Sequence, residues 1–168
     1  MVITKTYQDL KQVLMDTGSP KVKEPYYIID AGQQSIFIVS PGLNSTEYNK
    51  TEGFLSNFNG IHTFVCLYGQ GVVLMQRNDE MGGAKEFKLV TLNSGKQVLI
   101  PAGWAMCLVN IGKNLLVILG NIDINAKYLD SKQIFDKRGL VYFVVEKKGE
   151  VSFEQNPNYS VHPQIATE

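Results

Sequence analysis

The chain has 168 residues, of which 44% are hydrophobic and 19% are charged, a composition typical of one ordinary globular domain. Lysine and arginine number 16, aspartate and glutamate also number 16, and the formal net charge is zero. Without excess positive charge there is little electrostatic drive to bind nucleic acid. Apolar stretches such as 115–119 are too short to span a membrane, and the first residues lack the apolar run of a secretory signal. We therefore expect a cytoplasmic protein that binds neither nucleic acid nor membrane.

One helix is predicted near the beginning, over residues 7–16. Leu10, Val13 and Leu14 fall on one face at helical spacing, and Gly18 follows as a stop signal. A proline-containing loop then leads into the rest of the chain. We assign residues 1–24 to this N-terminal helix and loop.

From residue 26 onward the pattern is that of short β-strands separated by turn residues. The predicted strands cover 26–30, 35–40, 62–68, 72–76, 87–92, 97–100, 105–109, 115–119, 140–146 and 150–153. About ten short strands and a single helix indicate an all-β antiparallel sandwich or barrel. We expect one domain, 1–168, with the barrel at 25–155. The polar tail 156–168, including a solvated His162, is expected to be disordered or to lie on a partner.

The most specific motif lies in residues 95–110. Gly95 is followed by five residues, Pro101-Ala102-Gly103, two residues, Met106, three residues and Asn110. This spacing resembles the second motif of the cupin superfamily, with Met106 where that motif has a histidine. The first cupin motif is similar at its end, because six residues separate His62 from Gly69 and His62 takes the place of a glutamate. The resemblance implies a cupin, or jelly-roll, barrel.

A closer resemblance begins with the segment 41–53. It is similar to the segment before the metal-binding histidines in archaeal-type, cupin-fold glucose-6-phosphate isomerases. The shared residues are Pro41, Gly42, Glu47, Thr51 and Gly53. The stretches 100–105, 144–146 and 156–159 also resemble that family, so the similarity runs from about residue 7 to 159.

In that family three histidines and a glutamate hold a divalent metal that positions an open-chain sugar phosphate. The resemblance implies that Thr51 and Gly53 contact the phosphate of the substrate. It also matches Tyr128 to a phosphate-binding tyrosine of the family, beside an apparent insertion. Glu47 is a further ligand candidate, or else bonds backbone amides in its own loop. Family members are dimers, so the resemblance also implies a homodimer.

The metal ligands do not carry over, since their positions hold Phe54, Ser56, His62 and Met106. One imidazole is too few donors for manganese, iron or zinc, so we expect no metal and no other cofactor. His62 is a candidate catalytic base, because its reference pKa of about 6.5 suits proton transfer; the alternative is a hydrogen-bonded barrel histidine. His62, Cys66 and Met106 could together bind a soft Cu(I) ion. The alternative is that these side chains only fill the interior of the barrel.

Two cysteines do not make a disulfide framework in a chain of this size, so Cys66 and Cys107 are read as small core residues. The leading hypothesis is a catalytically degenerate relative of the isomerases that retains at most a pocket for a sugar phosphate or small anion. The alternatives are an active glucose-6-phosphate isomerase with an altered site based on His62, and a non-catalytic homodimeric scaffold with a filled barrel.

Overall fold

The computed structural model describes residues 1–168 and is nearly all β. Its helical segments are α1 (Tyr7–Leu10), a 3₁₀ turn (Lys11–Val13) and α2 (Lys132–Asp136). Its strands are β1 (Val2–Lys5), β2 (Tyr26–Asp30), β3 (Ser35–Val39), β4 (Leu43–Asn44), β5 (Glu47–Tyr48), β6 (Phe54–Ser56), β7 (Ile61–Tyr68), β8 (Gly71–Asn78), β9 (Ala84–Leu92), β10 (Gln97–Pro101), β11 (Trp104–Asn110), β12 (Leu116–Gly120), β13 (Leu129–Asp130), β14 (Tyr142–Lys147), β15 (Glu150–Gln155) and β16 (Ile165–Thr167).

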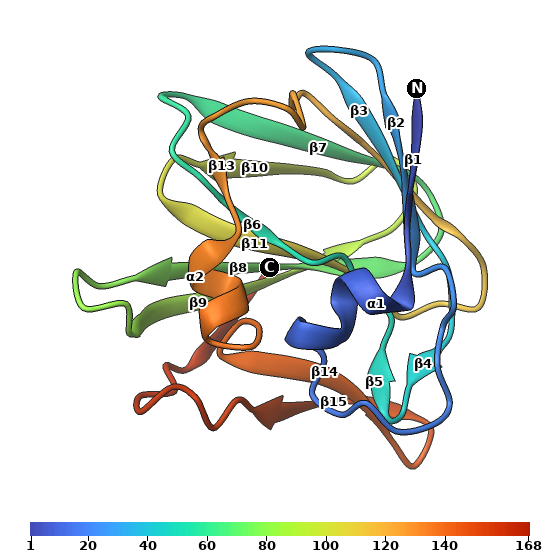
Figure 1. Ribbon diagram of the computed structural model, residues 1–168, viewed down its shortest axis with the longest axis vertical. Coiled ribbons are helices and arrows are strands. Elements are labelled where there is room, and N and C mark those ends of the chain that lie inside the picture. Colours follow the sequence, from blue (N-terminus) through green and yellow to red (C-terminus); the bar gives the residue numbers. More distant parts are fainter.

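Two six-stranded sheets form the body of the molecule (Figure 1). The first has the order β1-β2-β3-β12-β7-β10 and lies in the upper part of Figure 1; the second has the order β13-β6-β11-β8-β9-β16. A smaller sheet, β15-β14-β5-β4, lies below them. The sheets remain separate rather than closing into one continuous barrel, but the arrangement is that of a cupin jelly roll, which confirms the predicted fold class.

The hydrophobic core lies between the two large sheets because their strands alternate inward and outward side chains. In β7, His62, Phe64 and Cys66 are buried while the residues between them are partly exposed. The rings of Phe37 on β3 and Phe64 pack with centroids 6.1 Å apart. Both cysteines are buried and free, as predicted.

β8 does not alternate, since its first six residues are all buried. Its outer face is covered by the C-terminal part of the chain. Gln76 accepts a hydrogen bond from the backbone N–H of Val141 at 2.8 Å and donates one to the hydroxyl of Tyr159 at 3.2 Å. The strand is therefore buried on both faces, which explains its continuous apolar sequence.

The predicted N-terminal helix is shorter than expected. Leu10, Val13 and Leu14 are buried as predicted, but the α-helix ends at Leu10 and a single 3₁₀ turn follows. Leu14 already has extended backbone, with ψ 144°. This early exit lets the N–H of Met15 bond the carboxylate of Glu47 at 2.9 Å, a tertiary contact that ends the helix before Gly18.

The tail was predicted to be disordered or to lie on a partner, and this is wrong, because it packs on its own chain. β16 pairs in parallel with β9, with Ile165 opposite Phe87. His162 is only partly exposed, and its Nε2 lies 2.8 Å from the backbone oxygen of Asn156. The hydroxyl of Tyr142 donates to the carbonyl of Pro163 at 2.6 Å. Many backbone groups of the tail are thus bonded within the chain, which polar composition alone did not reveal.

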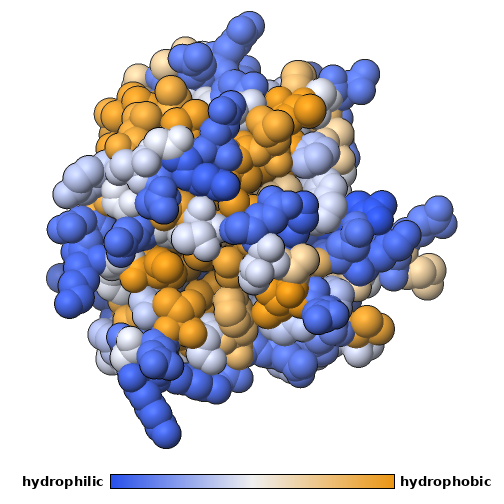
Figure 2. Space-filling model, turned by 180° about the vertical axis from the view of Figure 1, so that it is seen from behind, coloured by the Kyte–Doolittle hydropathy of each residue, from blue (hydrophilic) through white to orange (hydrophobic).

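The outer face of the first sheet is apolar across several strands. Pairing places Ile29, Ile36, Leu119 and Val65 side by side on four neighbouring strands, all partly exposed. Leu67 and Leu99 on the same sheet are 46% and 54% exposed. Apolar side chains gather in the upper half of the molecule in Figure 2, where this sheet lies. No helix in the molecule combines the length and apolarity needed to span a membrane.

Candidate functional site

The structure brings close together the positions at which the resemblance to the isomerases leads us to expect metal ligands. Phe54 on β6 lies directly opposite Met106 on β11 in the antiparallel pair. Ser56 follows two residues after Phe54 on the same strand, and its Oγ lies 2.6 Å from Nε2 of His62 on β7. Segments predicted from two separate motifs therefore meet at one place between the sheets.

His62 is held in an apolar, aromatic environment. Its side chain is 1% exposed, and its ring lies 5.1 Å from the ring of Phe58 and 5.7 Å from that of Tyr128. Nδ1 is buried and has no hydrogen-bond partner. Burial lowers the pKa of the imidazole, an effect that the backbone of Asn121 opposes in part. The neutral imidazole is therefore the stable form at neutral pH.

The serine beside His62 has a second partner that fixes its role. The backbone N–H of Phe58 donates to Ser56 Oγ at 3.1 Å. With that bond accepted, the Ser56 hydroxyl can donate its own proton to His62 Nε2. A serine and an imidazole at this distance resemble a nucleophile and its base, but no carboxylate orients the ring. Neither residue lines the cavity described next.

A cavity of about 270 Å³ opens beside these positions. Its apolar lining includes Phe54 and Met106, together with Phe37 and Leu108. The polar lining side chains are Lys5, Tyr26, Thr51, Glu52, Asn125 and Ser131. An apolar pocket with a few convergent polar groups is the usual form of a small-molecule site.

Comparison with known proteins identifies the relatives of this chain. The family model described as "Glucose-6-phosphate isomerase (GPI)" matches residues 5–162. The chain belongs to the glucose-6-phosphate isomerase family. Within that family, the glucose-6-phosphate isomerase of Pyrococcus furiosus is 28% identical over 152 residues, which cover 87% of this chain and 77% of that protein.

Solved structures are similar over part of the chain. The cupin domain of CENP-C from Drosophila melanogaster matches with a TM-score of 0.43 and 14% identity, over 56% of this chain and 62% of that one. The capsular polysaccharide assembling protein CapF from Staphylococcus aureus matches with a TM-score of 0.47 and 19% identity, over 68% of this chain and 32% of that one.

The residues present do not fit the metal of this isomerase family. No three or more histidine, cysteine, aspartate or glutamate side chains come close enough to hold an ion together. The aligned positions supply a phenyl ring, a thioether, a hydroxyl and one imidazole, whereas a hard or borderline divalent ion needs several nitrogen or oxygen ligands. A shared copper ion is also excluded, because His62 and Cys66 are four residues apart on one extended strand, a separation of roughly 13 Å.

Thr51 and Gly53, the phosphate contacts inferred from the isomerases, both line the cavity. The hydroxyl oxygen of Thr51 accepts the backbone N–H of Leu108 at 3.0 Å, so part of its bonding capacity is used within the protein. Gly53 has φ 87°, and a Cβ there would lie 2.9 Å from the carbonyl oxygen of Met106. The close approach of two backbones thus explains this glycine without a ligand.

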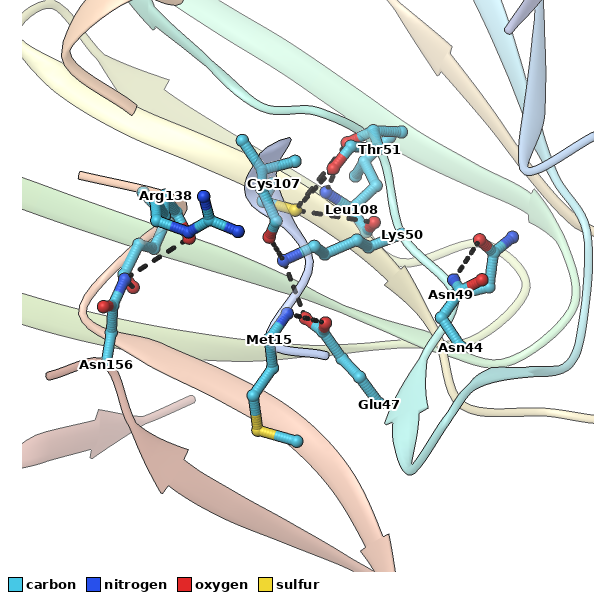
Figure 3. A network of polar contacts seen from close by, with 12 residues as sticks. Met15, Asn44, Glu47, Asn49, Lys50, Thr51, Cys107, Leu108, Arg138 and Asn156 are labelled. Atoms are coloured by element: carbon cyan, nitrogen blue, oxygen red, sulfur yellow. Dashed lines mark hydrogen bonds and ion pairs between the residues drawn. The ribbon is translucent and has the colours of Figure 1, made fainter. Parts of the chain in front are cut away.

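Glu47 lies away from the cavity, in a buried polar network (Figure 3). Its carboxylate accepts the N–H of Met15 at 2.9 Å and forms an ion pair with Nζ of Lys50 at 2.7 Å. Lys50 also donates to the carbonyl of Val13 at 2.7 Å and lies over the ring of Phe143. Burial raises the pKa of the Glu47 carboxyl, and Lys50 opposes this shift. The network joins the N-terminal segment to β5.

Tyr128 lies with Phe58 over His62 and is not part of the cavity lining, although its neighbours Ala126 and Leu129 are. Lys5 and Glu52 are among the lining residues that the sequence did not single out. Their charged groups lie 2.8 Å apart at the cavity. Glu52 stands between Thr51 and Gly53, which both match the family's motif, so its position in the sequence gave a local signal. Lys5 reaches the site only because β1 joins the sheet edge, which no local pattern indicates.

Proposed function

We propose that this member of the glucose-6-phosphate isomerase family has lost metal-dependent isomerisation and retains a small-molecule pocket between its sheets. The observation that carries the proposal is Phe54 facing Met106 where the family places imidazoles. These side chains supply no ligand for a divalent ion but form part of the apolar lining of the cavity. The family's isomerisation needs a metal to hold the two reacting oxygens of the substrate. Without ligands for that metal, this chain cannot carry out the reaction in the same way.

The assay that tests this proposal measures interconversion of glucose 6-phosphate and fructose 6-phosphate by the purified protein. It is run first with a chelator and then with iron, manganese, nickel or zinc added in turn. We expect no turnover above a heat-inactivated control under any condition. Metal-dependent turnover would show that the site binds an ion through groups other than the aligned ones, and the proposal would fail.

An active isomerase that uses His62 as its base is the competing function. Against it, the imidazole is buried under Phe58 and Tyr128 and does not line the cavity. General acid–base help alone also contributes only about 10²–10⁴-fold in rate. Turnover that persists with chelator and disappears in His62→Gln would favour this alternative. Turnover that survives in His62→Gln would exclude His62 as the base.

The sequence also predicts a phosphorylated sugar or small anion as the ligand, and this stays a prediction. It is supported by the position of Thr51 and Gly53 at the cavity. Stabilisation of the protein by glucose 6-phosphate without metal, absent in Thr51→Val, is the expected sign of such binding. Unchanged binding in Thr51→Val would remove Thr51 from the ligand contacts.

We further propose that the protein is a homodimer that uses the outer face of the first sheet. The row Ile29, Ile36, Leu119 and Val65 supports this, since extended apolar faces are rarely left in water. Light scattering after gel filtration measures the mass. We expect a dimer that Leu119→Glu converts to a monomer, with Thr91→Glu on the second sheet as the matched control. A monomeric wild type would contradict the proposal.

A further inference from the structure

The charges at the cavity balance within the protein. Lys5 is the only cationic side chain in the lining, and it pairs with Glu52, the only anionic one, at 2.8 Å. Both side chains are largely buried, with 28% and 15% exposure. A dianion entering here would have to separate this pair and then lie near the remaining carboxylate. The lining of the cavity therefore has no unpaired positive charge that could bind a phosphate.

The remaining polar groups are neutral and suit hydroxyl or amide partners. The Tyr26 hydroxyl lies 3.5 Å from the backbone N–H of Glu52, and burial holds the pKa of Tyr26 well above its usual value. The phenol thus stays protonated and able to donate. Ser131 donates its proton to the carbonyl of Gly53 at 2.8 Å, which leaves its oxygen free to accept. Both a donor and an acceptor are available without a net charge.

The apolar part of the lining sets a second requirement. The side chains of Phe54, Met106 and Leu108 offer no hydrogen bond. Hydroxyl groups of a sugar that lay against these side chains would have no partner, each at a cost comparable to a lost hydrogen bond. The part of a well-fitting ligand that contacts them is therefore apolar.

We infer that this cavity binds a small uncharged molecule that carries an apolar ring or branched chain and one hydroxyl group. The inference rests on the proposed retention of a pocket and specifies its ligand class. It departs from the phosphorylated sugar expected from the sequence, because the Lys5–Glu52 pair and the apolar side chains of Phe54 and Met106 both disfavour a charged, polyhydroxylated ligand.

The test compares two probes that share one ring, benzyl alcohol and benzyl phosphate, with glucose 6-phosphate as a third. Each is titrated into the full-length ¹⁵N-labelled protein, and amide chemical shifts are followed by NMR. We expect benzyl alcohol to shift the signals of Gly53 and Ala126 with a Kd on the order of 1 mM, and benzyl phosphate to bind at least about tenfold more weakly. Tighter binding of either phosphate, or no shift of lining residues by benzyl alcohol, would overturn the inference.

Four substitutions locate the site and test the charge argument. Ala126→Leu should weaken benzyl alcohol binding by filling the cavity, while Ala102→Leu, at an exposed turn, should not. Glu52→Gln frees the charge of Lys5 and should strengthen benzyl phosphate binding several-fold, whereas Lys5→Met should not. Equal effects of Ala126→Leu and Ala102→Leu would place the probe elsewhere and overturn the inference.

The outcomes separate this inference from the proposed function. A preference for benzyl phosphate, with no isomerase turnover, would overturn the ligand class and leave the loss of catalysis standing. Isomerase turnover in the assay above would instead overturn the proposed function, on which the inference rests.

Discussion

Nζ of Lys50 lies 2.7 Å from Oε2 of Glu47 at a position where the two side chains are only 7% and 1% exposed. The pair also holds the N-terminal segment, since Lys50 bonds the carbonyl of Val13 and Glu47 bonds the N–H of Met15. Removing two charges from water is costly, so each depends on the other and on these backbone partners. The conformation of residues 13–15 is consequently tied to the integrity of one ion pair.

Breaking this pair from one side should destabilise the protein strongly. Lys50→Met leaves a buried carboxylate without its cation, and we expect the free energy of unfolding in urea to fall by about 3–5 kcal/mol. The double variant Glu47→Leu/Lys50→Met removes both charges and should lose much less. Lys132→Met, in an exposed pair with Asp136, serves as the control and should change stability little. Equal losses in the single and double buried variants would contradict the account.

His62 should make the protein less stable as the solution becomes acidic. Burial lowers its pKa in the folded state below the reference value of 6.5, so the unfolded state binds more protons in the window between the two values. The stabilising contribution is present above pH 6.5 and is lost as the pH falls through that window. The measurement is the urea midpoint from pH 7.5 to about 5. In His62→Gln the decline over this window should be shallower than in the wild type; an identical decline would show that His62 is not its source.

The two cysteines should be unreactive in the folded protein. Burial raises the pKa of Cys107 to about 11, and burial also raises that of Cys66. Only the thiolate attacks alkylating reagents, and both sulfurs are shielded from solvent as well. We expect iodoacetamide to label neither cysteine in native buffer at mildly alkaline pH and both in denaturing urea, as read by mass spectrometry. Rapid labelling of Cys107 under native conditions would contradict its placement in the core.

The alignment of the missing metal ligands can be tested by restoring them. The variant Phe54→His/Ser56→His/His62→Glu/Met106→His places three imidazoles and a carboxylate at positions that the structure already brings together. We expect it to bind one equivalent of Mn²⁺ or Zn²⁺ and to gain about 2.7 kcal/mol of stability when the free metal reaches 100 times its Kd. The triple variant Phe54→His/Ser56→His/His62→Glu, which keeps Met106, should bind the metal more weakly. No uptake by the fully restored variant would show that the four positions do not form one coordination sphere.

The longer strands were predictable from sequence because runs of apolar and β-branched residues bounded by turn residues are local patterns. The spacing from Gly95 to Asn110 likewise indicates a turn between two strands. The short strands β4, β5 and β13, with two residues each, are too brief for any periodicity. Helix α2 covers only Lys132–Asp136 and was missed for the same reason.

The candidate site was predictable only in part. The positions of Phe54, Ser56, His62 and Met106 followed from motif spacing, but the polar side of the cavity did not. Lys5 meets Glu52 through the pairing of β1 with β2, a contact between segments far apart in the sequence. The role of Glu47 likewise depends on Lys50 and Met15 approaching it in space. Such convergence is a property of the assembled fold and leaves no local pattern.

The parallel pairing of β16 with β9 has a consequence for how the protein behaves in concentrated solution. Ile165–Thr167 cover the backbone groups along one side of β9, and Glu168 forms an ion pair with Lys88 at 2.9 Å that fastens the end of the chain. Without this cover, a nine-residue strand would present open N–H and C=O groups to any other extended chain. Residues 165–168 therefore block the pairing of β9 with another chain. Proteolytic cleavage before Ile165 would expose this edge and promote aggregation without altering the core or the cavity.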